Sequence, residues 1–439
     1  MLEKETAVLH KSNPTRSDYV GACRFFNNEQ VTDTAISKAF AEQTGEAAAG
    51  KNVIAIHDTT SVNFAAHSGY LDAEDEHLGP VGSEGGQGFF IHPTIVLDEA
   101  SGVLLGASDI YIWNRKENAP DKHERQYQEQ PTVEKESNRW IERCLASKKV
   151  LNQATSILFV ADREADIYEE FYGVPDAKSH VLIRCKANRL LHGGGKLYEA
   201  VAEQLVAGEL SVDIREAKKR KERKATLTIK YCKVRIARPK NHANKEDLPE
   251  FIELYGLEVK EKAATVPKGE KPISWILLTD KEITNLTQAL YFIKCYGLRW
   301  QIELVFGTLK SGGLELEESE LESGKALKIM AVMSFITALR VNQLRLNRSN
   351  TSLSATIIFT SAQISLLHLL VKKLEGKTEI QKNPHPAETM AWAIWVIARL
   401  GGWKGYSKSE SPPGNKTMYW GWNDFNKIYQ GWELNNNLK

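Results

Sequence analysis

Two aspartates stand directly after short apolar runs in the first half of the chain. Asp58 follows NVIAIH and Asp162 follows SILFVA, so each carboxylate is expected at the tip of a buried strand. The strand tips of a parallel or mixed sheet deliver side chains into a crevice where such folds bind ligands. Taken singly, either aspartate is more often a helix cap or a turn residue.

A third acidic residue lies in a helical pattern that runs from about Thr287 to Lys310. Within CYGLRWQIELVFGTLKSG, polar side chains of both signs recur with the spacing Y-x2-R-x3-E-x6-K, at Tyr296, Arg299, Glu303 and Lys310. On one continuous helix, at about 100° per residue, the four fall within an arc of about 60°. An ordinary solvated face with an i,i+4 ion pair is the alternative explanation.

Three gathered carboxylates suit chemistry on phosphodiesters. Transfer with two Mg²⁺ ions needs hard oxygen ligands and a metal pair about 4 Å apart, and Mn²⁺ fits the same ligands. Basic neighbours can hold the non-reacting phosphates, and a tyrosine hydroxyl can donate a hydrogen bond to another. We therefore predict that Asp58, Asp162 and Glu303 are both the catalytic and the metal-binding residues.

The elements that carry these residues follow the order βββ-α-β-α-β. NVIAIHD, GFFIHPTIVLD and GVLLGASDIYIW are expected strands, and a charged helix around EKESNRWIERCLASKKVL leads to SILFVAD, an amphipathic helix and HVLIRCK. An RNase H-like core shows this order. The predicted fold class is α/β, with an RNase H-like mixed-sheet catalytic core, a β-rich insertion and flanking helical regions. In the leading helical unit, Ser17 and Thr32 are the expected N-caps.

Five regions are expected along the chain. They are an N-terminal helical DNA-contacting remnant (1–45), the first part of the core (46–190), the β-rich insertion (191–272), the second part of the core with the third acid (273–370) and a C-terminal helical dimerisation region (371–439). Residues 215–240 of the insertion hold twelve Lys or Arg against two Glu. They are expected to form exposed β-hairpins that contact the DNA backbone, or alternatively a solvated, flexible hairpin tip.

Composition narrows the class of protein. The 439 residues, 42% of them hydrophobic, suffice for a globular protein of more than one domain. With 57 basic against 56 acidic residues, the net charge of +1 says little about partners. Five scattered cysteines without a C-x-x-C pair argue against a disulfide framework and a zinc ribbon, and favour a reducing cytoplasm. Without a long apolar run or a signal sequence, a soluble, unexported protein without membrane contact is expected.

The motifs resemble the insertion-sequence-four family of DDE transposases, in particular the transposon-five type. HDTTSVNF and ADREADIYEEF resemble the segments of the first and second catalytic aspartates. YGLRWQIELVFGTLKSG resembles the Y-R-E-K signature that holds the third acid. The similarity runs from about Gly21 to the C-terminal region and includes the flanking text RFFNNEQV, EKESNRW, VPKGEKPISWILLTD, LTQALYFIKCY and IARLGGW.

This resemblance implies a metal-dependent enzyme that cuts and joins DNA. Water nicks the transposon end, the released 3′-OH attacks the opposite strand to form a hairpin, the hairpin is reopened, and the 3′-OH joins target DNA. The implied partners are the double-stranded DNA of transposon ends and target, and a second copy of the chain on paired ends. The implied setting is a bacterial cytoplasm, associated with the nucleoid. Because the family's metals take oxygen ligands, His57 is expected to pack under the site.

The resemblance also implies residues that contact DNA. Trp275 lies at the position of an aromatic wall for a flipped base, with Trp300 as a second candidate; a core or domain-seam aromatic is the alternative for each. Three basic residues in and just after the HVLIRCK segment resemble family positions that touch the transposon end: Arg184, Lys186 and Arg189. Salt bridges to local acids are the alternative for each.

One departure from the family concerns the N-terminus. Family members carry a longer basic segment that recognises the transposon end, whereas about 23 residues precede Arg24 here. Two explanations are open. In the first, the chain is an active transposase whose start codon is placed too late; in the second, it is a shortened regulatory DNA-binding protein that inhibits transposition through mixed dimers. In-frame codons upstream that encode a basic helix would favour the first explanation. A structure-selective nuclease shares the acids but does not need Tyr296, Lys310 and Trp275 together.

Overall fold

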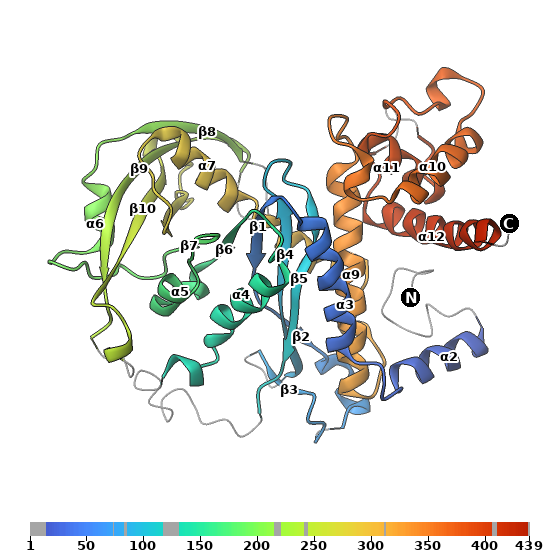
Figure 1. Cartoon of the computed structure of the whole chain (residues 1–439), viewed down its shortest axis with the longest axis horizontal. Coiled ribbons are helices and arrows are strands. Elements are labelled where there is room, and N and C mark those ends of the chain that lie inside the picture. The colour runs from blue at the N-terminus through green and yellow to red at the C-terminus, as the bar shows by residue number, and fades with distance from the viewer. Residues whose placement is uncertain are drawn as a thin grey trace. The chain divides into compact units, whose positions relative to one another are not determined.

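The computed structural model describes residues 15–72, 74–82, 86–116, 131–214, 221–240, 245–310, 313–405 and 411–437. The chain divides into two compact units. Unit 1 comprises Met1–Ala48, Thr59–Ala119 and Gln301–Lys439, and unit 2 comprises Ala49–Asp58 and Pro120–Trp300. Figure 1 shows the strands and helices of both.

Unit 2 is built on a mixed sheet of seven strands. Their order is β1-β6-β7-β11-β10-β9-β8, parallel from β1 to β7 and antiparallel from β7 to β8. The strands are β1 (Asn52–His57), β6 (Ser156–Ala161), β7 (Ser179–Arg184), β8 (Gly208–Ile214), β9 (Arg223–Ala237), β10 (Phe251–Glu261) and β11 (Ser274–Thr279). The unit's helices are α4 (Asn138–Val150), α5 (Tyr168–Gly173), α6 (Leu197–Ala202) and α7 (Leu286–Gly297).

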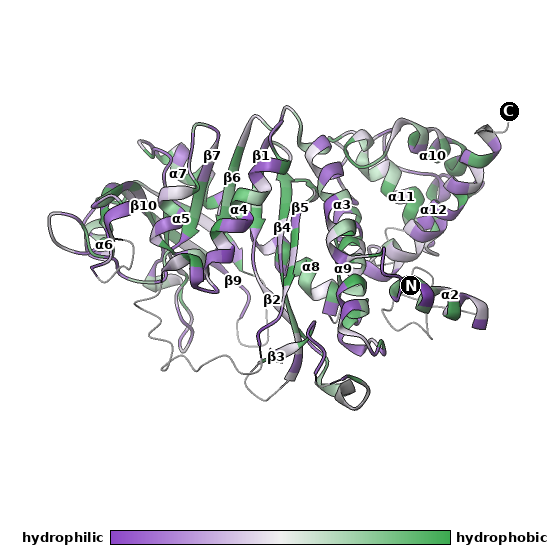
Figure 2. Cartoon of the chain, turned by 60° about the horizontal axis from the view of Figure 1, so that its bottom comes forward, coloured by the Kyte–Doolittle hydropathy of each residue, from purple (hydrophilic) through white to green (hydrophobic). Residues whose placement is uncertain are grey.

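The parallel part of this sheet forms the core that carries Asp58 and Asp162. In both β1 and β6, every residue after the first is buried, as expected where helical crossovers cover both faces of parallel strands. Figure 2 shows the hydrophobic colouring along β6. Each aspartate directly follows its strand, so the buried strand fixes the place where the carboxylate emerges.

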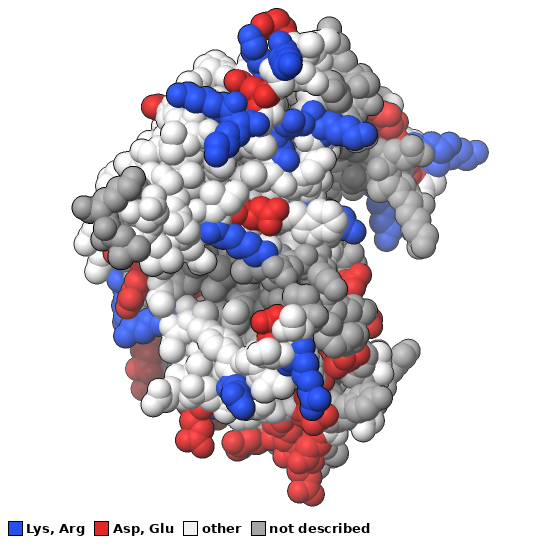
Figure 3. Space-filling view, turned by 90° about the vertical axis from the view of Figure 1, so that its right-hand side faces the viewer, with Lys and Arg blue, Asp and Glu red and all other residues white. Residues whose placement is uncertain are grey.

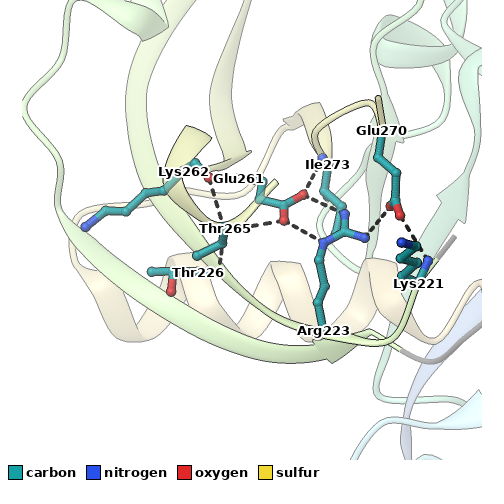
Figure 4. A network of polar contacts seen from close by, with 8 residues as sticks. All are labelled: Lys221, Arg223, Thr226, Glu261, Lys262, Thr265, Glu270 and Ile273. Carbon is teal, nitrogen blue, oxygen red and sulfur yellow. Dashed lines mark hydrogen bonds and ion pairs between the residues drawn. The ribbon is translucent and has the colours of Figure 1, made fainter. Parts of the chain in front are cut away.

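The antiparallel part of unit 2 contains the described part of residues 215–240. Residues 215–220 lie outside the described residues, and residues 223–237 form β9, which pairs antiparallel with β8 and β10. The expected β-structure is confirmed, but several side chains of β9 are buried rather than exposed. A buried ion network holds its first residue (Figure 4). The Arg223 guanidinium donates to Glu261 at 2.9 Å and to Glu270 at 2.6 Å. The alternation in ATLTIKYCKVRIAR is therefore that of a strand with one buried face.

Unit 1 combines antiparallel strands with most of the helices. β4 pairs with β2, β3 and β5. The strands are β2 (Thr60–Asn63), β3 (Gly79–Val81), β4 (Gly86–Asp98) and β5 (Leu104–Trp113). The helices are α2 (Arg16–Phe26), α3 (Asp33–Ala48), α9 (Gly324–Asn347), α10 (Ser361–Leu374), α11 (Met390–Leu400) and α12 (Asn415–Asn437), with α8 (Trp300–Lys310) beginning at the last residue of unit 2.

Helix α9 is the centre of unit 1. It is 24 residues long and buries residues on all of its faces, because α3, β5, α11 and α12 all pack against it. Helix α11, with the sequence MAWAIWVIARL, is buried from Met390 to Ala398. A helix that is apolar all round belongs in a core, so these two helices hold the helical region together.

The predicted fold class is confirmed: the chain is α/β, with a mixed sheet, flanking helices and the element order expected of an RNase H-like core. The short strands β2 and β3 were not predicted. Thr32 caps α3, as predicted, since its Oγ1 accepts from the Ala35 N–H at 3.1 Å. Ser17 is not a cap; Thr15 fills that position because its side chain accepts from the Asp18 N–H.

Short 3₁₀ helices complete the described part at Ala65–Tyr70, Thr132–Glu134, Arg163–Ala165, Lys245–Asp247, Ala263–Thr265, Leu316–Glu318, Ala355–Ile357 and Glu379–Gln381. Within the described ranges, no helix has the length and apolar character needed to cross a membrane.

Candidate functional site

Asp58 and Asp162 emerge side by side from neighbouring parallel strands. Ile56 of β1 pairs with Val160 of β6, and both aspartates come two residues further along. Adjacent strands lie about 4.8 Å apart, so the sheet itself delivers two carboxylates to one edge. This juxtaposition is what the apolar runs before each aspartate predict.

The Arg299 side chain bridges the two carboxylates. Its Nη1 lies 2.7 Å from Asp58 Oδ2, and its Nη2 lies 3.7 Å from Asp162 Oδ2. The three side chains are only 12%, 17% and 30% exposed for Arg299, Asp58 and Asp162. A cation between two carboxylates on adjacent strands offsets their mutual repulsion. The pair therefore has the hard oxygen donors and the charge that suit a divalent ion.

Two further side chains reach Asp162 Oδ1. The Tyr296 hydroxyl donates to it at 3.3 Å, and the Arg184 guanidinium lies 3.8 Å away at the end of β7. The backbone N–H of Arg163 also donates to this oxygen at 2.8 Å, so Asp162 caps the 3₁₀ helix that follows. Burial, helped by the Asp162 charge, raises the pKa of Tyr296 to about 12. Its hydroxyl is thus a hydrogen-bond donor at neutral pH.

The two candidate tryptophans differ in exposure. Trp275, on β11, is half-buried and meets the Tyr296 ring edge-on, with ring centroids 5.3 Å apart. Trp300, at the start of α8, is 62% exposed. Trp275 is thus packed beside the carboxylate pair of unit 2, while the Trp300 ring faces solvent.

The expected single helix from Thr287 to Lys310 is wrong. Helix α7 ends at Gly297, a turn occupies 298–299, and α8 begins at Trp300. The backbone tightens there, since the Arg299 N–H donates to Tyr296 O at 3.1 Å in an i→i+3 bond. Glycine has a low helix propensity and permits such a break. The four signature residues therefore do not form one helical stripe.

The signature residues are distributed over both units. Tyr296 and Arg299 belong to unit 2, and Glu303 and Lys310 belong to unit 1. Glu303 lies in the first turn of α8, and Lys310 is its last residue. The Lys310 ammonium lies 3.7 Å from a carboxylate oxygen of Glu317.

Arg189 and Lys186 do not join the carboxylate pair. The Arg189 guanidinium binds Asp166, whose carboxylate is almost fully buried, at 2.7 Å, which is the salt-bridge alternative. The Lys186 backbone N–H donates to the same carboxylate at 2.8 Å, and its side chain is exposed. Asp166 was not predicted as a functional residue. The signal for it was the second aspartate of ADREAD, four residues after Asp162.

Three basic residues of the segment 215–240 are paired with acids. Lys233 and Arg235 of β9 both bind Glu253 of β10, and Arg223 lies in the network of Figure 4. On another face of the molecule, Figure 3 shows Lys and Arg side chains beside Asp and Glu. Because the net charge is only +1, binding of a polyanion depends on local basic groups, among which Arg184 and Arg299 lie at the carboxylate pair.

His57 lies beneath the carboxylate pair in the core of unit 2, as predicted. It is fully buried and packs edge-on against Trp140 and Phe159. Burial, together with the Arg139 charge, lowers the pKa of His57 to about 3, so the imidazole is neutral.

Comparison with known proteins gives limited matches. No protein-family model matches the chain. Among solved structures, the chain is similar to piggyBac transposase in the cryo-EM structure of its synaptic complex with hairpin DNA, with a TM-score of 0.26 and 10% sequence identity. The match covers 76% of this chain and 61% of that chain, which is less than two thirds of the length of that transposase.

Proposed function

We propose that the chain is a DDE-type DNA transposase of the insertion-sequence-four kind, which cuts and rejoins DNA at transposon ends. The observation that carries the proposal is the pair of carboxylates, Asp58 and Asp162, at the tips of adjacent parallel strands with one arginine shared between them. The Y-R-E-K spacing after them supports the same conclusion.

Asp58, Asp162 and Glu303 are the proposed ligands of two Mg²⁺ ions, for which Mn²⁺ can substitute. When bound, the ions supply activation of the attacking oxygen and stabilisation of the leaving oxygen in phosphodiester transfer. The donor set supports this assignment, because all three residues offer hard carboxylate oxygens. The arginine that now balances Asp58 indicates that this edge of the sheet demands positive charge.

The neighbouring residues are proposed to hold the DNA rather than the ions. Once its charge is no longer needed by Asp58, Arg299 can turn its guanidinium to a non-reacting phosphate, which it can bind in a bidentate manner. Arg184 is placed to do the same from the end of β7. Tyr296, protonated at neutral pH, donates a hydrogen bond to a phosphate oxygen. Lys310 and Lys186 are proposed to contact DNA further from the reacting atoms, whereas Arg189 is held by Asp166.

Trp275 is the proposed stacking surface for a base flipped out when the end closes into a hairpin. It lies against Tyr296, so a base stacked on it stays next to Asp162. Stacking on an aromatic ring contributes roughly 1–3 kcal/mol and tolerates any base. The exposed Trp300 is the second surface of this kind.

The proposed partners are the double-stranded DNA of transposon ends and target, and a second copy of the chain on paired ends. Residues 371–439 are the proposed pairing region. The exposed apolar side chains there support this role, among them Trp420 at 41% and Leu434 at 65% exposure. Such groups on one helix are candidates for burial in an interface.

The experiment is excision from a supercoiled plasmid that carries the element's own ends, with Mg²⁺. The proposal predicts excision by the unmodified chain and none by Asp58→Asn, Asp162→Asn or Glu303→Gln. A matched control is Glu253→Gln, which removes a carboxylate from β10. Equal excision by the three triad variants and the control would contradict the proposal. So would cutting that continues in excess chelator.

A further inference from the structure

A second group of metal-ligating side chains lies in the core of unit 2. His57 Nε2 is 3.7 Å from Cys144 Sγ and 3.8 Å from Glu170 Oε1, and the three ligand atoms all lie within 4.8 Å of one another. The residues come from three elements, the end of β1, the middle of α4 and α5. All three side chains are completely buried.

Glu170 is the residue whose burial needs an explanation. Both of its carboxylate oxygens are buried and have no hydrogen-bond partner among the residues that the structure describes. A buried carboxyl group without a partner destabilises the fold as a neutral acid and destabilises it more as an anion. The His57 Nε2 atom, 3.8 Å from Glu170 Oε1, lies beyond hydrogen-bond distance. The position therefore lacks a group that would compensate the carboxylate.

The geometry fits a zinc ion between the three side chains. Tetrahedral Zn²⁺ bonds of about 2.0–2.3 Å to nitrogen, oxygen and sulfur place pairs of ligand atoms about 3.3–3.6 Å apart. Two of the observed separations, 3.7 and 3.8 Å, exceed these values by a few tenths of an ångström, and the third pair, Cys144 Sγ and the Glu170 carboxylate, lies within 4.8 Å. Small side-chain rotations would close that difference, so the backbone of β1, α4 and α5 can stay where it is.

The charges fit as well. A thiolate from Cys144 and a carboxylate from Glu170 together balance the two positive charges of Zn²⁺, and a neutral imidazole adds none. The buried cluster would then be neutral as a whole, which removes the cost of an isolated charge in the core. The nearby Arg139 is itself paired with Glu136 and Glu164, so it does not claim the Glu170 carboxylate.

We propose that His57, Cys144 and Glu170 form a buried structural zinc site, with a water molecule as the fourth ligand. The site ties the end of β1 to α4 and α5. Because Asp58 directly follows His57, the bound ion would fix the strand end from which that carboxylate emerges. This site is separate from the Asp58 and Asp162 oxygens and stands whether or not the chain is a transposase.

The test is the zinc content of the purified full-length chain after refolding with Zn²⁺ and dialysis, measured by elemental mass spectrometry. The expected result is about one zinc per chain. Cys144→Ser should lose it, whereas the matched control Cys295→Ser, a buried cysteine of α7, should keep it. Asp162→Asn should also keep it, which separates this site from the carboxylate pair. In the Co²⁺-substituted chain, a sulfur-to-cobalt charge-transfer band should be present and should be missing from Cys144→Ser.

A second variant keeps the test decisive if Cys144→Ser folds poorly. If Glu170 is a zinc ligand, the Glu170→Gln variant should bind zinc more weakly. Chelator should then lower the melting temperature of the unmodified chain but not that of the variant. If Glu170 is instead a neutral acid, the glutamine variant should be as stable as the unmodified chain with and without chelator. Equal stability of Glu170→Gln and the unmodified chain would overturn the proposal. A chain that binds no zinc after refolding would overturn it as well, and so would zinc retained by Cys144→Ser.

Discussion

Replacing Arg299 with glutamine should destabilise unit 2 in the absence of divalent ions. The guanidinium lies 2.7 Å from Asp58 and 3.7 Å from Asp162. Without it, two carboxylates on adjacent strands repel each other, and the glutamine amide can offer a hydrogen bond but no charge. Glutamine keeps most of the side-chain length, so the loss of packing is small.

The size of the effect follows from how far these groups are withdrawn from water. An exposed ion pair contributes about 0.2–1 kcal/mol, and breaking a fully buried one costs about 3–5 kcal/mol. Arg299 is 12% exposed and Asp58 is 17% exposed, so the cost lies between these limits, at roughly 2 kcal/mol. Mg²⁺ at ten times its dissociation constant should restore about 1.4 kcal/mol of this loss.

The assay is urea denaturation at pH 7, with excess chelator and then with Mg²⁺. Arg235→Gln is the matched control, because Arg235 is 57% exposed and binds a glutamate that is 41% exposed. It should lose less than about 0.5 kcal/mol, and Mg²⁺ should stabilise it only as much as it stabilises the unmodified chain, in which Arg299 still competes with the ion for the carboxylates. The reasoning is refuted if Arg299→Gln is as stable as Arg235→Gln in chelator, or if Mg²⁺ stabilises both variants equally.

Three further predictions concern unit 2. Tyr296→Phe should slow DNA cutting by the same factor at pH 7 and pH 9 in an end-cleavage assay, because a pKa of about 12 keeps the hydroxyl protonated at both pH values; a factor that shrinks at pH 9 would contradict this assignment. Trp275→Ala should weaken hairpin formation by roughly 1–3 kcal/mol while the first nick persists, as separated on denaturing gels; equal loss of both steps would argue against stacking. Burial opposes ionisation of Asp176, but hydrogen bonds from the Lys148 ammonium and two backbone N–H groups outweigh it and hold its pKa well below the usual value. A depressed pKa stabilises the fold above the unfolded value of about 3.9 and loses that effect as pH falls through the folded value. Asp176→Asn should therefore cost less than about 1 kcal/mol at neutral pH, since the side chain is half exposed; in denaturation curves the difference should vanish in strong acid, and a difference that grows there would refute it.

The sequence predicts the long strands and misses the short ones. β1 and β6 are apolar runs that end in an aspartate, and their burial on both faces leaves a clear signal. β2 and β3 have four and three residues, which is too short for alternation to be read. Their pairing with β4 supplies what their own residues do not specify.

The candidate site is predictable only in part. The apolar runs that end in Asp58 and Asp162 predict that both carboxylates emerge at one edge of the sheet. Arg299, however, lies 241 residues from Asp58 in the chain. No local pattern reports that contact. The turn between α7 and α8 was missed because Gly297 stands alone inside an apolar periodicity that otherwise continues. A single glycine in such a pattern is often tolerated without a break.

The same limit applies to the buried residues behind the site. His57, Cys144 and Glu170 lie on three separate elements, and the spacing between them resembles no metal-binding motif. Only the parallel pairing of β1 with β6 and the packing of α4 and α5 bring them together. The fold determines this cluster, so the sequence alone could not report it.

The most direct measurement is a metal-specificity switch at Asp162. Asp162→Cys replaces a hard oxygen ligand with a thiolate, which binds Mg²⁺ poorly and accepts the softer Mn²⁺. If Asp162 holds an ion during cutting, this variant should fail to cut transposon-end DNA with Mg²⁺ and regain cutting with Mn²⁺, while Asp162→Ala stays inactive with both. Cutting by Asp162→Cys with Mg²⁺ at the rate of the unmodified chain would contradict the proposed role of the carboxylate pair.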